Sequence, residues 1–140
     1  MAIANRYVFD ACALLALIYK EAGGDIVKSI LKQARDGNAT IYMNKLNLYE
    51  VYYDVLRSKG QKQADKFYNM VLMSPIQITD DIPDAIFRKG AYLKTQYKMS
   101  LADSILLGEA SFRSASILTA DHHEFDIVEQ NEDIQFTWLR

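Results

Sequence analysis

The sequence has 140 residues, a length typical of one domain and sufficient to bury a sizeable core. Half of the residues are hydrophobic and 24% are charged, a balance that excludes a disordered, collagen-like or low-complexity chain. The formal net charge is -2, from 16 basic and 18 acidic residues, so a nucleic-acid partner would need a local basic patch instead of a generally positive surface.

The first predicted elements are a short strand and an apolar helix. Residues 7–9 are β-branched or aromatic and favour a strand that stops at Asp10, where a stretch rich in Ala, Leu and Ile favours a helix. The apolar run at 11–19 is far shorter than the roughly 20 residues of a membrane span, and its charged flanks do not suit a signal peptide. We therefore expect a buried helix here and no membrane segment.

Glycine and proline residues divide the rest of the chain into further short elements. Alternating or β-branched runs predict strands at 40–43, 76–78, 116–120 and 135–138. Helical periodicity predicts helices at 26–34, 45–58, 61–73, 83–97 and 101–113, the second and third of which form a hairpin around Gly60. The polar segment between the last two strands carries no pattern that assigns it.

The alternation of strands and helices indicates the fold class. Strands joined by helices favour parallel pairing through right-handed crossovers. We expect one α/β domain over residues 1–140, a three-layer sandwich with a central parallel sheet of four to five strands. The single cysteine, Cys12, cannot form an intramolecular disulfide, so a reducing cytoplasm is the expected compartment.

Two aspartates directly follow predicted strands. Asp10 comes after the strand at 7–9, and Asp121 comes after the strand at 116–120. Ligands of open parallel sheets bind outside the carboxyl ends of the strands, so both carboxylates belong to the edge where a site is expected. Aspartate is also common at strand-to-helix turns because it caps helices, and this structural role stays open for either residue alone.

Two further acids lie on predicted helices. Asp103 follows Ser100 by three residues, which suits a capping box, but it also begins the apolar face of its helix. Glu50 lies on the narrow polar strip of a mostly apolar helix, and this strip is either a solvated face or the wall of a polar cleft. A helix this apolar must be covered on several sides, so we favour the cleft, and we favour a functional role for Asp103.

Four carboxylates at one sheet edge would repel one another unless a cation lies between them. All-oxygen ligands select Mg²⁺ or Mn²⁺ over Zn²⁺, and such ions characteristically hold phosphates. Metal-dependent attack of water on a phosphodiester suits a site of this kind. The candidate catalytic and metal-binding residues are therefore Asp10, Glu50, Asp103 and Asp121.

Four segments resemble, in order, the motifs of PIN-domain ribonucleases, notably the VapC-type toxins of bacterial and archaeal toxin–antitoxin pairs. They are VFDACALLAL at 8–17, NLYEV at 47–51, SLADS at 100–104 and LTADHHEF at 118–125. Each segment carries one of the four candidate acids, and the resemblance extends over nearly the whole chain.

The resemblance implies a Mg²⁺- or Mn²⁺-dependent endoribonuclease, usually a homodimer, that a partner antitoxin holds inactive. It also implies that the four acids bind metal directly or through water, and that Thr119 is a hydroxyl that orients a carboxylate or a water. The family often has Ser or Thr right after its first Asp, whereas this chain has Ala11 and Cys12.

Several neighbouring residues are interpreted as structural. We expect Cys12 to be a small buried residue and not a nucleophile, because no base is evidently paired with it. His122 and His123 are adjacent, so their side chains diverge, and packing or surface roles are expected for both. Asp126 is considered as an outer acid.

Two kinds of binding surface are expected besides the acids. RNA binding by a chain of this charge requires basic residues beside the site. The candidates are Lys45, Arg57, Lys94 and Lys98. The alternative is that these four are ordinary solvated side chains. The hairpin at 45–73 carries Tyr49, Tyr52 and Tyr53 and has more apolar surface than one sheet face covers. We expect a second copy, an antitoxin helix, or both to pack on it.

Two other functions compete with this interpretation. A catalytically silent PIN-like subunit would keep the fold and serve only as an antitoxin-binding or scaffold module, although all four acids are present. Phosphoaspartate phosphatases and receiver domains also place an aspartate at the end of a first strand. The phosphatase pattern has a second Asp where this chain has Cys12, and a receiver has an acidic pair at that strand and a late lysine.

Overall fold

A five-stranded sheet lies at the centre of the computed structural model, which describes residues 5–140. The strands are β1 (Asn5–Phe9), β2 (Ala39–Asn44), β3 (Ile76–Thr79), β4 (Ser116–Thr119) and β5 (Phe136–Trp138). Their order is β3-β2-β1-β4-β5, and every neighbouring pair is parallel. The predicted α/β class with a central parallel sheet is confirmed.

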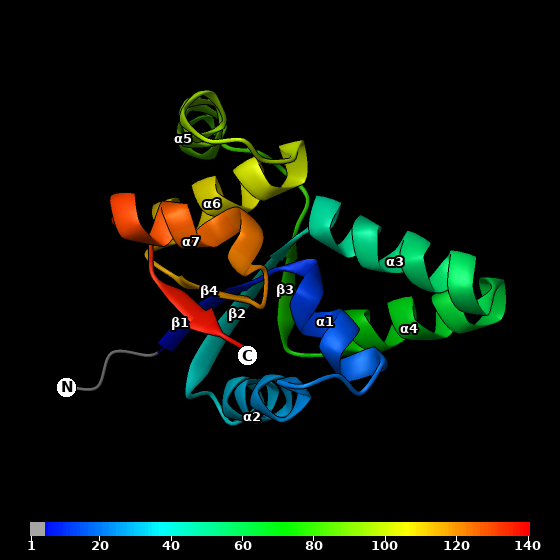
Figure 1. Ribbon diagram of the computed structural model, residues 1–140. Helices are drawn as coiled ribbons and strands as arrows, with labels where there is room; N and C mark the ends of the chain where they lie inside the picture. The colour runs from blue at the N-terminus through cyan, green and yellow to red at the C-terminus, as the bar shows by residue number, and fades with distance from the viewer. Residues whose placement is uncertain (1–4) are drawn as a thin grey trace.

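Helices cover both faces of this sheet (Figure 1). One side carries α1 (Ala11–Ile18), α2 (Gly24–Arg35), α3 (Lys45–Lys59) and α4 (Gln61–Met73), and the other carries α5 (Asp84–Gln96), α6 (Leu101–Arg113) and α7 (His122–Asn131). Because side chains alternate along a strand, Phe9 and Leu118 pack into the first core, whereas Val8 and Ile117 pack into the second. Two cores separated by one sheet form the expected three-layer sandwich.

The helix starts follow from local capping. The Asn44 side-chain oxygen accepts a hydrogen bond from the Leu46 amide (2.7 Å) and begins α3 directly after β2. Ser100 begins α6 in the same way by accepting from the Asp103 amide (3.1 Å). Gly60 separates α3 from α4 with a φ of 90°, a backbone conformation that glycine adopts without strain. These caps keep the acids of α3 and α6 near the carboxyl edge of the sheet.

One helix occupies the polar segment that no sequence pattern assigned. Helix α7 buries only Phe125 and Val128, three residues apart, and most of its other side chains face solvent. Asp121 begins this helix by accepting a hydrogen bond from the Glu124 amide (3.1 Å). Two core contacts and one cap are too weak a periodic signal to stand out in the sequence.

The α3–α4 hairpin extends away from the sheet (Figure 1). Tyr52 is partly buried and packs edge-on against Tyr68 of α4, with ring centroids 6.0 Å apart. Tyr49 and Tyr53 are exposed, so they do not contribute to the core. Among the described residues, no helix combines the length and hydropathy needed to cross a membrane.

Candidate active site

Asp10 and Asp121 lie at the carboxyl ends of two neighbouring strands. Asp10 follows β1, and its backbone amide donates to the Leu118 carbonyl of β4 (3.2 Å). Its Oδ1 accepts from the Ala11 amide at the start of α1 (2.7 Å), and Asp121 caps α7 as described above. Both aspartates therefore cap helices and also stand at the sheet edge where a ligand is expected.

Asp103 and Glu50 approach the same edge from two helices. Asp103 lies in the first turn of α6, where Ser100 caps its backbone amide, and its side chain is half-buried. Glu50 is also half-buried, and its Oε1 accepts from Asn47 Nδ2 (3.2 Å). Asn47 is fully buried, so the polar strip of α3 turns inward at these two residues and is not a solvated face there.

The charges of the four carboxylates act on one another. Burial raises the pKa of Asp103 to about 7, and the carboxylates of Asp10, Glu50 and Asp121 contribute to this increase. Burial also raises the pKa of Asp10, with a smaller contribution from Asp121, and the pKa of Glu50, with a contribution from Asp10. The four acids therefore share one electrostatic environment although they come from four different elements.

Thr119 links the two strand-end aspartates. Its buried hydroxyl donates to Asp10 Oδ2 (2.7 Å) and accepts from the Asp121 backbone amide (3.1 Å). Both oxygens of Asp10 are thus held, Oδ1 by Ala11 and Oδ2 by Thr119. Each oxygen keeps further acceptor capacity, because a carboxylate has about four lone-pair sites.

The donor set fits a hydrated divalent cation. In residues 5–140 the ion pairs involve other groups, so no Lys, Arg or His side chain neutralises the four acids by a direct contact. The buried Asn47 Oδ1, whose amide contacts Glu50, also lacks a hydrogen-bond partner. Across this range, no group of three or more His, Cys, Asp or Glu side chains is arranged to hold a metal ion. Carboxylates that are coupled in charge suit an ion that keeps several of its waters, as Mg²⁺ does.

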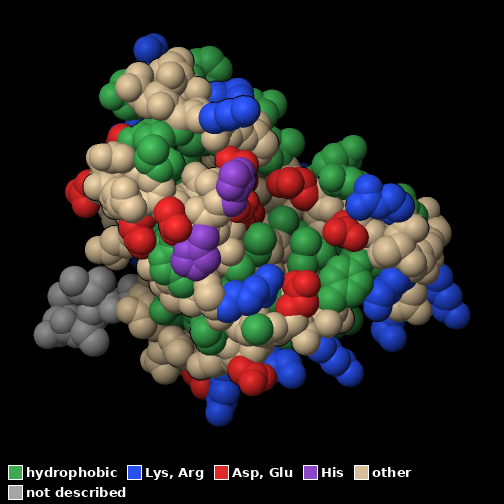
Figure 2. Space-filling model, in the orientation of Figure 1, with side chains coloured by type: hydrophobic (Ala, Val, Ile, Leu, Met, Phe, Trp, Pro, Cys, Tyr) green, Lys and Arg blue, Asp and Glu red, His purple; other side chains and the backbone are tan. Residues whose placement is uncertain are grey.

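Acidic side chains gather toward the middle of the face shown in Figure 2, with lysine, arginine and histidine side chains nearby. The four candidate RNA contacts are all exposed: Lys45, Arg57, Lys94 and Lys98. The Arg57 guanidinium lies over the Tyr53 ring, 5.5 Å from its centroid, and Lys94 Nζ donates to the Met99 carbonyl (2.8 Å).

A cavity of about 590 Å³ lies between the end of α5 and the start of α7. Lys98 and Met99 line it on one side, immediately before the capping residue Ser100. His123 and Glu124 of α7 line it on the other side, two and three residues after Asp121. None of the four acids lines this cavity, but its walls precede Asp103 and follow Asp121 in the chain, and one of the candidate basic residues, Lys98, lines it.

Histidine and cysteine residues near the site have structural surroundings. The His122 ring stacks on Trp138, with centroids 3.8 Å apart, and bonds to Asp126 Oδ1 (2.7 Å) and the Arg140 carbonyl (2.8 Å). Asp126 is thus engaged on the surface by His122. Burial, followed by the nearby Asp10 carboxylate, raises the pKa of Cys12 to about 12, so the thiol stays protonated at neutral pH.

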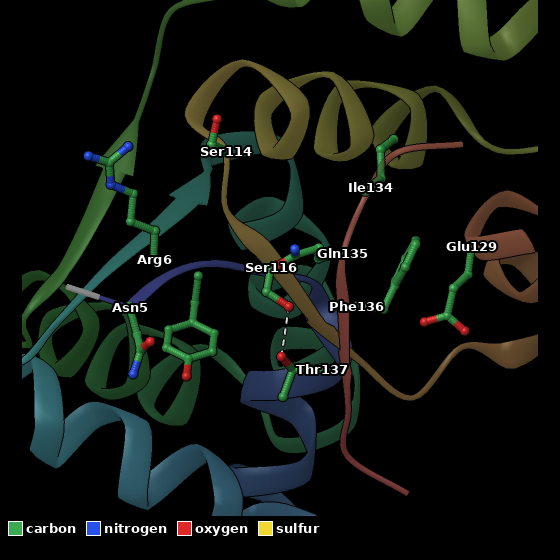
Figure 3. A pocket seen from close by; sticks show the side chains of 10 residues that line it. Asn5, Arg6, Ser114, Ser116, Glu129, Ile134, Gln135, Phe136 and Thr137 are labelled. Carbon is green, nitrogen blue, oxygen red and sulfur yellow. Dashed lines mark hydrogen bonds between the residues drawn. The ribbon is translucent and has the colours of Figure 1, made fainter. Parts of the chain in front are cut away.

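A second cavity shows that volume alone does not locate the site. It measures about 710 Å³ and lies around the amino-terminal ends of β1 and β4, beside β5 (Figure 3). Its lining includes Arg6, Glu129 and Phe136, and a hydrogen bond joins the Ser116 and Thr137 hydroxyls across it (2.7 Å). None of the four coupled acids lines it.

Sequence reasoning did not single out Glu109. This residue is fully buried on α6 and accepts hydrogen bonds from Asn44, Thr79 and Arg113. The position of Glu109 inside the apolar run ILLGEA could have indicated a buried polar network, because a buried charge is rare without dedicated partners. The partners themselves come from distant segments and could not be read from the local sequence.

Comparisons with known proteins agree with this fold. A family model described as "PIN domain" matches residues 7–130. No curated protein matches the chain. Solved structures with a similar fold include VapBC2 from Rickettsia felis bound to a DNA fragment from its promoter, with 18% identity over 94% of this chain and 97% of that chain and a TM-score of 0.74.

Two further structures have the same fold. DNA-bound VapBC from Salmonella typhimurium is 12% identical over 97% of this chain and 99% of that chain, with a TM-score of 0.74. VapC20 from Mycobacterium tuberculosis, described as a sarcin-ricin loop cleaving toxin, is 12% identical over 89% of this chain and 95% of that chain, with a TM-score of 0.61.

Proposed function

This chain belongs to the PIN domain family, and we propose that it is a metal-dependent endoribonuclease, the toxin of a type II toxin–antitoxin pair. The observation that carries this proposal is the set of four carboxylates at the carboxyl edge of the sheet. Burial raises the pKa values of Asp10, Glu50 and Asp103, and the charges of neighbouring carboxylates of the set add to each increase. Such a cluster is unfavourable without a cation and is useful with one.

Asp10, Glu50, Asp103 and Asp121 would hold Mg²⁺ or Mn²⁺, directly or through water. A bound ion of this kind activates water and stabilises charge on the leaving oxygen of a phosphodiester. At pH 7 without an ion, a large share of the Asp103 carboxyl groups carries a proton, because the pKa is about 7. Loading the site favours loss of that proton, so metal binding and proton release are coupled.

Thr119 would orient Asp10 for this task. If its hydroxyl bond to Asp10 Oδ2 holds the carboxylate in place, Thr119→Val should weaken metal affinity and cleavage by about 10- to 100-fold. Thr119→Ser keeps the hydroxyl and should retain most of both. Calorimetric Mn²⁺ titration and cleavage rates check this, and wild-type affinity and cleavage in Thr119→Val would show that the hydroxyl bond does not orient Asp10.

RNA would reach the acids past exposed basic side chains. We propose Lys98, which lines the cavity between α5 and α7, as a phosphate contact, with Lys45, Arg57 and Lys94 as further exposed candidates. Lys94 donates to the Met99 carbonyl and so also steadies the loop that carries Lys98.

Charge removal at Lys94 and Lys98 should weaken RNA binding. The double variant Lys94→Gln/Lys98→Gln is expected to lower RNA affinity and to reduce the slope of log affinity against log salt by about 0.7 for each phosphate that is no longer neutralised. The matched control is Lys62→Gln/Lys66→Gln, which removes two exposed charges from α4. An unchanged affinity and salt slope in the first double variant would show that neither lysine binds RNA.

The regulatory partner would be an antitoxin protein. The structures named above include VapBC assemblies, and the fold of this chain matches theirs over most of its length. We propose that the exposed apolar side chains of the α3–α4 hairpin bind a second copy, so that the toxin is a homodimer, and that a neighbouring groove takes an antitoxin segment. The expected compartment is the cytoplasm, where RNA and such a partner occur.

A nuclease assay on the purified protein tests the proposed activity. Total RNA should be cleaved in Mg²⁺ or Mn²⁺, the cleavage should stop in EDTA, and it should return when the metal is restored. Absence of cleavage under all metal conditions would favour a catalytically silent PIN-like subunit. Cleavage that persists in EDTA would contradict the metal-dependent site.

A further inference from the structure

Glu109 is a fully buried carboxylate with partners on three sides. Thr79 Oγ1 of β3 donates to Glu109 Oε1 (2.9 Å) and lies 3.0 Å from Oε2, and Asn44 Nδ2 donates to Oε2 (3.3 Å). Arg113 Nε, one turn along α6, forms a salt bridge with Oε1 (3.3 Å). The Arg113 guanidinium also lies over the Tyr42 ring of β2, 4.2 Å from its centroid.

Asn44 makes this network relevant to the active site. Its Oδ1 caps α3 by accepting from the Leu46 amide, while its Nδ2 donates to Glu109. The orientation of the Asn44 amide is therefore set from both ends, because a flip would break the cap and place its oxygen against a carboxylate. Through this one side chain, Glu109 of α6 is bonded to the residue that begins α3.

The two helices that this network joins each carry one of the coupled acids. Asp103 precedes Glu109 by six residues on α6, a distance of about 9 Å along the helix axis. A tilt of α6 by about 10° about this anchor would move Asp103 by about 1.5 Å. Displacements near 1 Å are large enough to impair a catalytic arrangement by about 100-fold.

We propose that Glu109 is a positioning residue that locks α6 to the start of α3 and thereby sets the separation of Asp103 and Glu50. The effect on metal binding rests on the proposed function, whereas the locking of the two helices does not. Glu109 touches neither substrate nor metal and acts only through the elements that it joins.

The arrangement of donors allows a test by exchange of partners. Both Glu109 oxygens accept from donors, so Glu109→Gln must set its amide group against the Asn44 amide or the Arg113 guanidinium. Asn44→Asp alone keeps a residue type that caps helices but sets two carboxylates against each other. The double variant Asn44→Asp/Glu109→Gln restores one donor facing one acceptor and keeps the original net charge.

We expect Glu109→Gln to weaken Mn²⁺ binding by about tenfold or more, as measured by calorimetry, and the double variant to recover most of the affinity. Hydrogen exchange in the first turn of α3 should accelerate in Glu109→Gln and return toward the wild-type rate in the double variant. Thr79→Val removes one donor without stranding a charge and should shift both readouts less, in the same direction. Thr79→Val takes the place of Glu109→Gln in the test if the Glu109→Gln protein does not fold.

A general loss of stability is excluded by Val27→Ala, which removes buried methyl groups from α2 in the core on the other face of the sheet. This control should lower the melting temperature and leave Mn²⁺ affinity unchanged. Wild-type Mn²⁺ affinity in Glu109→Gln, or in Thr79→Val where the former does not fold, would overturn the positioning role. If the wild-type protein binds no Mn²⁺, the proposed function fails instead, and unaltered exchange at the start of α3 would then overturn the helix lock.

Discussion

Asp10→Asn and Asp103→Asn are each expected to reduce metal-dependent RNA cleavage by about 10³-fold or more, because each removes a charge from the group that would hold the ion. Neither change should disturb the fold. Asparagine still caps α1 in place of Asp10, and Ser100 still caps α6 in the Asp103 variant. Cleavage rates of the purified variants in Mg²⁺ and Mn²⁺ measure the effect.

The same variants should be at least as stable as the wild-type protein when metal is absent. The folded-state pKa of Asp103 is about 7 and the ordinary pKa of an aspartate is 3.8, so folding favours the protonated carboxyl. The wild-type protein therefore loses stability as pH rises from about 4 to about 7, and the loss is complete above the folded-state pKa. Asp103→Asn does not ionise, so its advantage in melting temperature should grow over this range and then level off.

A matched control separates the cluster from general charge effects. Asp25→Asn removes an exposed carboxylate from the first turn of α2 and should leave cleavage and its metal dependence unchanged. Wild-type cleavage by Asp10→Asn or Asp103→Asn, with contaminating nuclease excluded, would remove that residue from the catalytic set. A melting temperature that falls in metal-free buffer would show that the carboxylate is held by favourable contacts instead of repelled by its neighbours.

A homodimer in micromolar solution is the second expected result, with the α3–α4 hairpin at its interface. Tyr49 is 65% exposed and Met73 is 88% exposed. Further exposed apolar side chains on the same hairpin are Leu46, Tyr53, Met70 and Leu72. A monomer seldom leaves a contiguous apolar surface above several hundred Å² in water, and tyrosine buries a large area at low entropy cost.

Light scattering should give about twice the mass of one chain for the wild-type protein and a monomer mass for Leu72→Glu, because Leu72 is exposed and no basic residue lies one helical turn before it. A charge buried at an interface without a partner opposes association, so one substitution on this surface suffices. Phe87→Glu is the control, because Phe87 is also exposed but lies on α5, outside the hairpin. A monomer mass for the wild-type protein at this concentration would contradict the dimer. The antitoxin would then be the remaining candidate to cover the exposed hairpin surface.

The fold was readable from the sequence where the local signals agreed. The helices Gln61–Met73 and Leu101–Arg113 have the predicted bounds, because a glycine or serine cap begins each and a periodic apolar stripe continues it. Helix α7 was not readable, because only Phe125 and Val128 mark its buried face. The exposure of Tyr49 and Tyr53 was also open, since an apolar helix does not show which side the sheet covers.

The strand-end acids were readable for a different reason. Asp10 and Asp121 follow strands of a parallel sheet, and that topology brings such positions together whatever the intervening sequence. The capping and site interpretations of Asp103 are not exclusive. Ser100 caps its backbone amide, and the charges of the other acids help to raise the pKa of its carboxyl group. The Thr119 bond to Asp10 depends on a register between β1 and β4 that only the structure specifies.

The buried partners of Glu109 mark the limit of sequence reasoning. Asn44 and Thr79 end two different strands, and nothing in their local sequence relates them to a glutamate on α6. A polar network of this kind depends on the relative positions of three elements, which follow from packing on the sheet.

Titration of the metal-free protein with Mn²⁺ tests the central claim most directly, because the claim is that the four acids at the sheet edge hold a divalent ion. We predict one or two bound ions per chain, proton release on binding near pH 7, and loss of binding in Asp10→Asn and Asp103→Asn. An absence of Mn²⁺ binding by the folded wild-type protein, or binding that survives both substitutions, would contradict it.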